Sequence, residues 1–255
     1  MWIDTHCHLD FIYNKNQLEI NNFGEQELID FVIAPSANHQ SFACLVELSH
    51  LNSKFKPAFG FHPLYIKGLA DEAMQVLEKQ IVSYKPIAIG EIGLDFYQNN
   101  KEFEALQVFY FEEQLKLAAK YSLPVILHVR SAIDRVISIV KKFPTVKGIA
   151  HAFNGSEQQA HILAKLGYKL GFGGAMTYSR ALKIRNLAIN LPLDYIVLET
   201  DAPDMNPAWL DKNKLNHPNE ISRIGEFFAS IRGMSKEELA KIIYNNTQQI
   251  FTQLN

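Results

Sequence analysis

The sequence contains little cysteine and no long run of apolar residues. Cys7 and Cys44 are the two cysteines among 255 residues, which is too few for a disulfide framework. No stretch approaches the roughly 18 uninterrupted apolar residues that a membrane helix needs. The chain begins directly on an apolar–polar strand at Trp2, with no basic and apolar leader before it. We therefore expect a cytoplasmic, reduced protein with no membrane partner.

The sequence also lacks a large net charge of either sign. Lys and Arg number 25 against 27 Asp and Glu, so the formal net charge is -2. No global field would then coat the protein with duplex DNA or lipid, and any nucleic-acid contact has to be local. With 47% hydrophobic and 20% charged residues, and without an interdomain linker or internal repeat, the sequence predicts one globular domain over residues 1–255.

Short apolar runs alternate with longer amphipathic ones along the chain. The first predicted strand begins at Trp2 and ends in His6-Cys7-His8, and seven more follow at 28–35, 57–63, 86–93, 123–130, 146–151, 167–172 and 194–201. Helices are predicted at 41–51, 71–83, 101–121, 133–140 and 219–231, and residues 202–218 read as a long surface loop. Ser235, with Glu238 three residues on, predicts a capping box that opens the last helix.

The order of these elements predicts a closed parallel barrel. Helices between successive strands permit right-handed parallel crossovers throughout. A competing open dinucleotide-binding sheet needs a glycine-rich loop after its first strand, where this sequence has His6-Cys7-His8. We therefore predict an α/β fold, a (β/α)8 TIM-like barrel.

Metal-competent residues recur at the predicted strand ends. Alternate residues of a strand face the same way, so the two histidines of His6-Cys7-His8 face one side and the cysteine the other. The spacing of the whole set averages about 28 residues per strand–helix unit, the size of a βα repeat. Because active sites of barrels form at the C-terminal ends of the strands, we expect six side chains to converge there. They are His6, His8, Glu91, His128, His151 and Asp201.

Four imidazoles and two carboxylates suit two divalent ions better than one. A single tetrahedral ion that keeps an open position needs fewer ligands. A carboxylate can bridge two ions, and Glu91 is the predicted bridge. We assign His6, His8 and Asp201 to one ion, and His128 and His151 to the other. Such a mixed set accepts Zn, Mn, Co or Mg. The alternative is that each residue is a separately hydrogen-bonded polar group at the start of a loop.

Six motifs occur in this order: IDTHCHLD at 3–10, GFHP at 60–63, GEIGLD at 90–95, PVILHVR at 124–130, HAFNG at 151–155 and LETDAP at 198–203. They resemble those of the TatD-type metal-dependent hydrolases and deoxyribonucleases. ETDAPDM at 199–205 and GFGG at 171–174 most resemble the YjjV-like branch of that family. The resemblance implies an amidohydrolase-like TIM barrel and a divalent-metal site on the six residues above. It also implies hydrolysis of phosphodiester bonds, usually as 3′-to-5′ exonuclease action on DNA.

Several residues beside the predicted ligands have two interpretations each. His62 could hold a substrate phosphate or hydrogen-bond a loop carbonyl. Arg130 could grip a phosphate with its guanidinium fork or pair with Asp134, and we favour the phosphate. Glu199 could orient a histidine or a water, or pair with an arginine in the barrel floor. Residues 154–156 open a helix whose amides could hold an anion or could simply be capped.

Four functions are candidates for such a site. The first is a two-metal phosphodiesterase acting on nucleic-acid ends or on a small phosphodiester, with no obligate protein partner. The second is a metal-dependent amidase or lactonase. The complete ligand set argues against a binding protein on the same scaffold, and the open barrel mouth argues against a structural zinc site. Amidase relatives commonly bridge their metals with a carboxylated lysine, where this chain has Glu91.

Glu91 therefore favours phosphodiester chemistry, and we assign catalytic roles to Asp201 and Glu91. We predict that a metal-bridging hydroxide is the nucleophile and that Asp201 orients it or accepts its proton. No serine or cysteine nucleophile, and no covalent intermediate, is then required.

Overall fold

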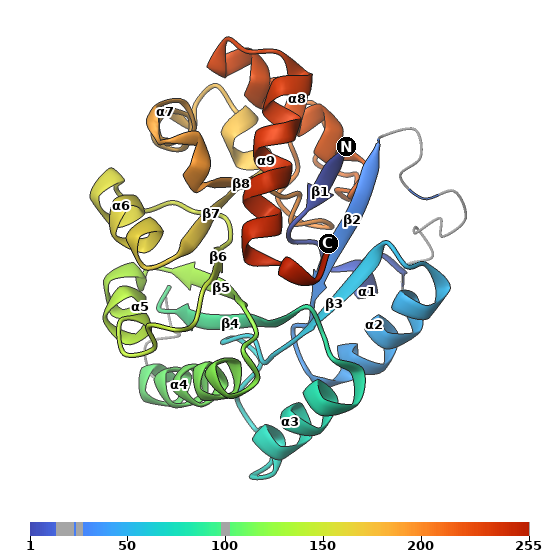
Figure 1. Ribbon diagram of the computed structural model, residues 1–255, viewed down its shortest axis with the longest axis vertical. Helices are drawn as coiled ribbons and strands as arrows, with labels where there is room; N and C mark the ends of the chain where they lie inside the picture. The colour runs from blue at the N-terminus through green and yellow to red at the C-terminus, as the bar shows by residue number, and fades with distance from the viewer. Residues whose placement is uncertain (14–22, 24–27, 98–102, 255) are drawn as a thin grey trace.

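Eight parallel strands form one sheet in which the spatial order follows the sequence from β1 to β8 (Figure 1). The computed structural model describes residues 1–13, 23, 28–97 and 103–254. The strands are Trp2–Asp4, Ile29–Pro35, Phe55–Phe59, Ala88–Asp95, Val125–Arg130, Gly148–Ala150, Tyr168–Phe172 and Ile196–Leu198. The predicted barrel class is therefore confirmed.

The barrel closes between its first and last strands through the segments that follow them. The backbone N–H of Thr5 donates to Leu198 O at 3.1 Å, and Cys7 forms a parallel bridge with Ala202. The Asp4 carboxylate strengthens this seam, because it accepts the backbone N–H of Thr200 at 2.9 Å and the Thr200 hydroxyl at 2.5 Å. The seam brings the segment after β1 beside the segment after β8.

Helices surround the strands and separate most of them in sequence. They are α1 Leu9–Tyr13, α2 His39–Leu51, α3 Ala73–Tyr84, α4 Glu104–Tyr121, α5 Ile133–Val140, α6 Glu157–Lys165, α7 Leu182–Asn190, α8 Glu220–Arg232 and α9 Lys236–Ile250. Short 3-10 helices occur at η2 Gly174–Thr177, η3 Leu193–Tyr195 and η4 Thr252–Leu254. Within the described residues, no helix combines the length and the apolar composition that crossing a membrane requires.

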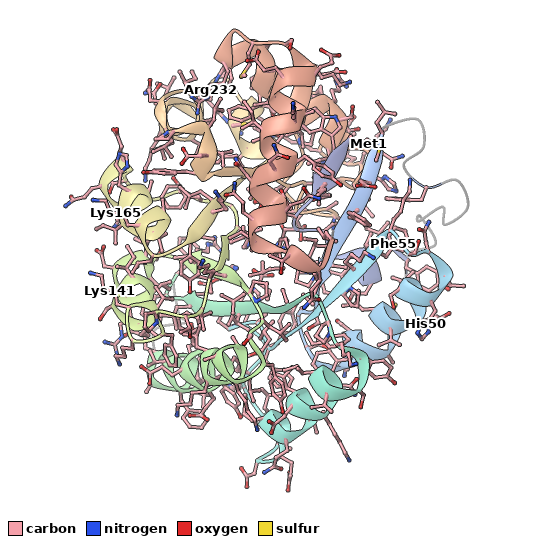
Figure 2. The ribbon with its side chains drawn as sticks, in the orientation of Figure 1. Met1, His50, Phe55, Lys141, Lys165 and Arg232 are labelled. Carbon is pink, nitrogen blue, oxygen red and sulfur yellow. The ribbon has the colours of Figure 1, made fainter. Side chains whose placement is uncertain are left out.

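Apolar side chains fill both the barrel interior and the layer between strands and helices. Figure 2 shows the side chains on the ribbon. In the interior, Ile3, Ile126 and Val197 pack with Phe251 and Leu254 from the C-terminal segment. In Figure 1 the end of α9 and the C-terminus lie over the open end of the strands that faces the viewer. The C-terminal segment thus plugs the N-terminal end of the barrel.

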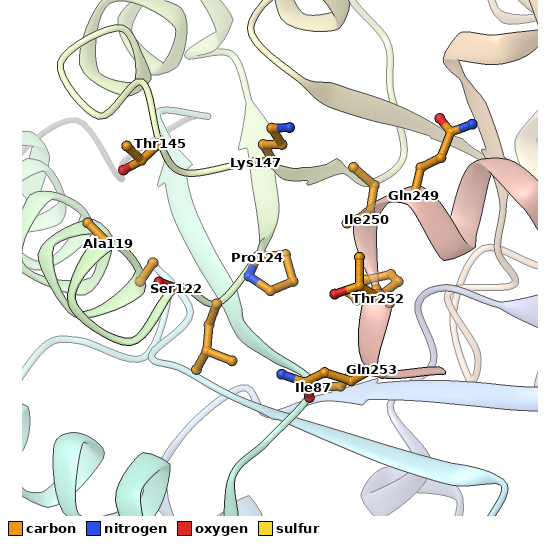
Figure 3. Close-up of a pocket in the computed structure, with 13 residues that line it drawn as sticks. Ile87, Ala119, Ser122, Pro124, Thr145, Lys147, Gln249, Ile250, Thr252 and Gln253 are labelled. Atoms are coloured by element: carbon orange, nitrogen blue, oxygen red, sulfur yellow. The ribbon is translucent and has the colours of Figure 1, made fainter. Parts of the chain in front are cut away.

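A cavity of about 210 Å³ lies beside this plug (Figure 3). It is lined by residues that precede the strands, such as Pro124 and Lys147, and by Gln249 and Thr252. None of the predicted metal ligands lines it.

The structure corrects several boundaries. β1 ends at Asp4, so His6 and His8 lie just past the strand, where the backbone bonds to both β2 and the segment after β8. β4 continues to Asp95 because it pairs with β5 along this length, and Glu91 therefore lies inside the strand rather than at its end. β3 spans Phe55–Phe59, so His62 lies in the following loop.

The observed helices differ less from the predicted ones than the strands do. Helices α1 and α7 were not predicted. α4 is described from Glu104, and the predicted start at residues 101–102 lies outside the described residues. Ser235 Oγ accepts the N–H of Glu238 at 3.2 Å, which is one of the two bonds of the predicted capping box. The complete box is at Ser156 and Gln159, so the helix start at 154–156 is an ordinary cap.

Candidate metal centre

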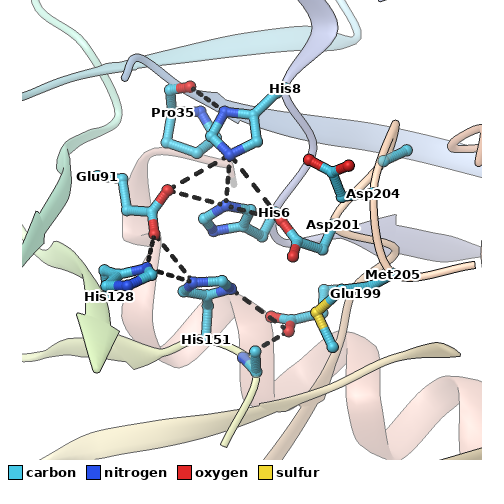
Figure 4. Close-up of polar contacts among 12 residues, drawn as sticks. His6, His8, Pro35, Glu91, His128, His151, Glu199, Asp201, Asp204 and Met205 are labelled. Carbon is cyan, nitrogen blue, oxygen red and sulfur yellow. Dashed lines mark hydrogen bonds and ion pairs between the residues drawn. The ribbon is translucent and has the colours of Figure 1, made fainter. Parts of the chain in front are cut away.

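Glu91 lies at the centre of a cluster of imidazoles at the C-terminal end of the barrel (Figure 4). Its Oε2 is 3.3 Å from His6 Nε2 and 3.4 Å from His8 Nε2. Its Oε1 is 2.8 Å from His128 Nδ1 and 2.9 Å from His151 Nε2. Oε1 also lies 3.5 Å from His62 Nε2. The two carboxylate oxygens thus face different histidines, which is an arrangement that a carboxylate between two cation positions would have.

Asp201 completes the first of these pairs. Its Oδ1 is 3.4 Å from His6 Nε2 and 3.9 Å from His8 Nε2, and these two ring nitrogens are 3.3 Å apart. On the other side, His151 Nε2 and His128 Nδ1 are 3.5 Å apart. The structure therefore brings all six predicted residues together. Because His6 also lies close enough to share a cation with Glu91 and His151, the assignment of ligands to two ions stays a prediction.

The chemistry of these groups fits a cation. His8 Nδ1 lies 3.2 Å from the carbonyl of Pro35, so in the neutral ring Nδ1 carries the proton and Nε2 presents a lone pair. That lone pair faces Glu91 and Asp201, whose carboxylate oxygens are also acceptors. Buried acceptors that face one another are costly unless a proton or a cation lies between them. The residues present would suit a divalent ion.

The pKa shifts of His8 and His151 indicate the same need for positive charge, whereas that of His6 does not. Burial would lower the pKa of His8, but the hydrogen bond and charge of Glu91 raise it to about 9. Glu91 and Glu199 likewise raise the pKa of His151 well above its usual value, against the effect of burial. Burial, together with the charge of His151, holds the pKa of His6 well below normal. Burial also raises the pKa of Asp201 to about 6.

Three non-glycine residues at this mouth have a left-handed backbone. Ser131 (φ 55°) lies directly after Arg130, and Ala152 (φ 45°) lies directly after His151. Asp201 (φ 55°) is itself a predicted ligand. Such conformations are unfavourable for residues with a Cβ and cluster at functional sites, where the surrounding structure holds them.

A family model described as TatD related DNase matches residues 3–252. The chain belongs to this TatD family. The metal-dependent hydrolase YjjV of Escherichia coli is 36% identical over 254 residues, covering 98% of this chain and 97% of that protein. The 3′-5′ ssDNA/RNA exonuclease TatD of Erwinia billingiae is 33% identical over 200 residues, covering 75% of this chain and 76% of that protein.

Solved structures agree with this assignment. The crystal structure of E. coli YjjV superposes with a TM-score of 0.91 at 33% identity and covers 98% of both chains. A TatD-family hydrolase from Entamoeba histolytica, at 22% identity, shares the fold with a TM-score of 0.80 and covers 98% of this chain and 97% of that one. The TatD-family chain is a metal-dependent hydrolase.

Two carboxylates stand behind the histidines of this TatD-family site. Asp95 Oδ2 is 3.1 Å from His128 Nε2, and Glu199 Oε1 is 3.7 Å from His151 Nδ1. A carboxylate behind a metal-ligating imidazole fixes the orientation of the ring and increases its basicity. The sequence did not reveal the role of Asp95, although a second acidic residue four positions after Glu91 in the same strand was a usable signal.

Glu199 is held by the backbone rather than by an arginine. Its Oε1 accepts the N–H of Ala152 at 2.6 Å, and within the described ranges no arginine pairs with it, so the predicted arginine alternative is wrong. Its carboxylate needs the glycine at 171, because a Cβ there would come within 2.1 Å of Glu199 Oε2. The orienting interpretation of Glu199 therefore fits the contacts.

His62 is a neutral hydrogen-bond donor that points into the TatD-family site. Its Nδ1 accepts the backbone N–H of Leu64 at 3.1 Å, so the neutral ring carries its proton on Nε2. That Nε2 lies 3.0 Å from His128 Nδ1 and 3.5 Å from Glu91 Oε1. Burial lowers the pKa of His62 to about 3, which keeps the ring neutral. Although His62 is close enough to join a metal cluster with these two residues, its tautomer makes it a donor instead of a ligand.

Arg130 lies at the open side of the same pocket. Its side chain is 53% exposed, and its guanidinium is 3.9 Å from the centre of the Tyr97 ring and 4.0 Å from Asp95 Oδ2. Asp134, the predicted alternative partner, instead accepts a hydrogen bond from Gln159 at 2.7 Å. The guanidinium is thus available to an anion that enters the pocket.

The pocket that contains these groups has a volume of about 200 Å³. Phe11, Leu64 and Tyr65 line it on one side, and Arg130 and Asp204 are also part of its wall. It combines one apolar side, a cation and the ligand cluster, which is the composition of a small-molecule or chain-end site.

Proposed function

We propose that this TatD-family chain hydrolyses phosphodiester bonds as a 3′-to-5′ exodeoxyribonuclease, using two divalent cations. The observation that carries the proposal is the carboxylate of Glu91, whose two oxygens face different histidines. Oε2 faces His6 and His8, and Oε1 faces His128, His151 and His62. The similarity to an exonuclease named for single-stranded DNA and RNA supports the choice of substrate class.

The ligand positions follow from the contacts. His6, His8 and Asp201 would hold one cation, His128 and His151 the other, and Glu91 both. Cations in these positions supply an activated water at neutral pH and offset the charge that develops on the phosphoryl oxygens. Glu91 is suited to a permanent ligand because the surrounding imidazoles, His62 and His151 foremost, hold its pKa well below normal despite its burial.

Asp201 is suited to accept the proton of the attacking water. Its pKa of about 6, raised by burial, is close to neutral, so the carboxylate is ionised at pH 7 and can still hold a proton for a short time. It lies beside His6 in the segment that follows β8, where it could orient water as well as bind metal.

The scissile phosphate would be held from two sides. His62 donates its Nε2–H to a phosphoryl oxygen from the side of β3, and the Arg130 guanidinium contacts the phosphate from the side of β5. Both groups favour an anionic substrate. A neutral lactone or amide would make no ion pair with Arg130, and the predicted bridging residue is Glu91 rather than a lysine.

A substrate panel tests the proposal. Purified protein is stripped of metal, reloaded with Zn, Mn, Co or Mg, and assayed on single-stranded DNA, RNA, a chromogenic phosphodiester, a lactone and a cyclic amide. We expect hydrolysis of DNA, with a label at the 3′ end released first as a mononucleotide. Asp201→Asn is the inactive control, and Asp71→Asn, an exposed carboxylate near α3, is the matched active one. Turnover of lactone or amide, with no phosphodiester cleaved under any metal, would reject the proposal.

A further inference from the structure

We infer that Asp204 makes the TatD-family site selective for phosphodiesters over phosphomonoesters, because its carboxylate places a fixed negative charge in the wall of the pocket that contains the predicted ligands. The inference rests on the proposed function and narrows its substrate class. A phosphodiester carries one negative charge. A phosphomonoester carries about 1.5 to 2 negative charges at pH 7.

Asp204 lies in the segment that follows β8, close to the ligand cluster. It lines the same pocket of about 200 Å³ as His8 and Asp201, and Figure 4 shows it on the side of the cluster where these two residues lie. The residue is exposed, and within the described part of the chain its carboxylate has no hydrogen-bond or ion-pair partner. No neighbouring cation therefore neutralises this charge before a substrate enters.

The backbone of Asp204 is held in place by a buried amide. Asn216 is fully buried, and its Nδ2 donates to Asp204 O at 2.8 Å and to Thr200 O at 2.8 Å. The backbone N–H of Asp204 donates to Asp201 O at 2.9 Å. The position of Asp204 is thus fixed relative to the predicted ligand Asp201.

The residues after Asp204 are held from the side of η2. A Cβ at Gly174 would come within 2.2 Å of Met205 O, so only glycine lets the two segments approach this closely. Thr177 Oγ1 accepts the backbone N–H of Ala208 at 2.7 Å. Because the segment is tied on both sides, the carboxylate of Asp204 is presented without a further cost of ordering the backbone on binding.

Charges of opposite sign lie on two sides of the pocket. Arg130 ends β5, whereas Asp204 follows β8, and β6 and β7 separate these strands in the sheet. Among the described residues that line the pocket, Arg130 is the one permanently charged cation. The two charged oxygens of a bound diester would face the proposed cations, His62 and Arg130. A monoester has a third charged oxygen, for which the lining offers no further cation and which Asp204 repels.

The same repulsion acts on the product of the proposed reaction. When a diester is hydrolysed, one ester oxygen leaves as the alcohol and the oxygen of water takes its place on phosphorus. The remaining monoester then carries the additional negative charge. Asp204 therefore favours release of the product as well as rejection of monoesters from solution.

Binding is measured by calorimetry at pH 8 on the metal-loaded full chain, with phenyl phosphate as the monoester and diphenyl phosphate as the diester. Asp204→Asn keeps the shape of the side chain and removes its charge. Because repulsion scales with ligand charge, we expect this change to strengthen binding about threefold for the diester and about tenfold for the monoester at low salt. At about 1 M salt most of this gain should disappear, because ions screen an exposed charge.

Two further variants control for effects other than charge. Asp204→Glu keeps the charge and should bind both esters nearly as the unmodified chain does. Asp211→Asn removes an exposed carboxylate from the same segment, outside the pocket lining, and should change neither affinity. In turnover, Asp204→Asn should lower about threefold the ratio of kcat/KM on bis(4-nitrophenyl) phosphate to that on 4-nitrophenyl phosphate.

The outcomes separate this inference from the proposed function. If diesters are cleaved but Asp204→Asn changes the two affinities equally or not at all, the role of Asp204 is wrong and the function stands. If no phosphodiester is cleaved but phenyl phosphate gains more than diphenyl phosphate, the function is wrong and the charge selection stands. Weaker binding of the diester to Asp204→Asn, or loss of an ion by elemental analysis, would overturn the inference, because Asp204 would then contact substrate or metal directly.

Discussion

Asp95 Oδ2 lies 3.1 Å from His128 Nε2, and this contact turns the opposite nitrogen of the ring, Nδ1, toward Glu91 Oε1 at 2.8 Å. The carboxylate of Asp95 is fully buried. The position of the proposed cation at His128 would therefore depend on a residue that would not itself contact the metal.

Replacing Asp95 by Asn tests this dependence. The amide keeps the shape and the Oδ1 acceptor for Tyr97 but removes the charge behind His128. We expect the affinity of the cation held by His128 and His151 to fall 10- to 100-fold, the usual scale for losing a carboxylate behind a metal-ligating histidine. Competition with a chromophoric chelator measures it. An unchanged affinity for both ions would show that Asp95 does not orient His128.

Metal removal should abolish activity without unfolding the chain. The ligands lie at the C-terminal mouth, whereas the apolar interior is plugged at the other end by Phe251 and Leu254, and Asp4 and Thr200 close the seam. Bound metal then stabilises only by mass action. Circular dichroism of the chelated protein should show a cooperative thermal transition at a lowered Tm, and a random-coil spectrum would indicate a structural metal site instead.

Metal affinity should rise with pH across neutrality. The pKa of His8 is raised to about 9 by Glu91, so the free site holds a proton there at pH 7 that a cation must displace. The proton and the metal compete for the same nitrogen. For each proton that the metal displaces, the apparent metal affinity should therefore fall about tenfold when the pH is lowered by one unit. Chelator competition between pH 6 and 8 checks this, and a flat profile after correction for the chelator would contradict the shifted pKa.

Asp201 and Cys7 should differ sharply in their effects on turnover. Asp201→Asn should lower kcat about a hundredfold or more, the scale for loss of a proton-handling group. Cys7 is fully buried in the apolar layer, so Cys7→Ser should change kcat little, although a buried hydroxyl costs about 1–3 kcal/mol of stability. Rates are compared per metal-loaded chain. Loss of turnover in a loaded Cys7→Ser protein, or a trapped phosphoryl-enzyme seen by mass spectrometry, would refute the hydroxide mechanism.

Much of the fold and the ligand set could be predicted from the sequence because both follow a periodic rule. Strand–helix alternation predicts the barrel, and polar residues at the strand-end interval predict which side chains meet. The same rule placed Glu91 at the end of β4, whereas pairing with β5 extends the strand to Asp95. Strand length depends on the neighbouring strand, which local sequence does not specify.

The residues behind the ligands could not be predicted in the same way. Whether Asp95 or Glu199 orients a histidine depends on which ring nitrogen faces the carboxylate, and that is set by tertiary contacts. His62 is a donor at Nε2 because its Nδ1 accepts the backbone N–H of Leu64, a tertiary-structure contact that the sequence does not specify.

Elemental analysis measures most directly whether Glu91 joins two cation sites. The unmodified, fully loaded protein should contain two divalent ions per chain. His128→Ala should keep about one, held by His6, His8 and Asp201, and Glu91→Gln should weaken both. Lys79→Ala, a control at an exposed lysine on α3, should still contain two divalent ions per chain. A single tightly held ion in the unmodified, fully loaded chain would contradict the bridged two-cation site.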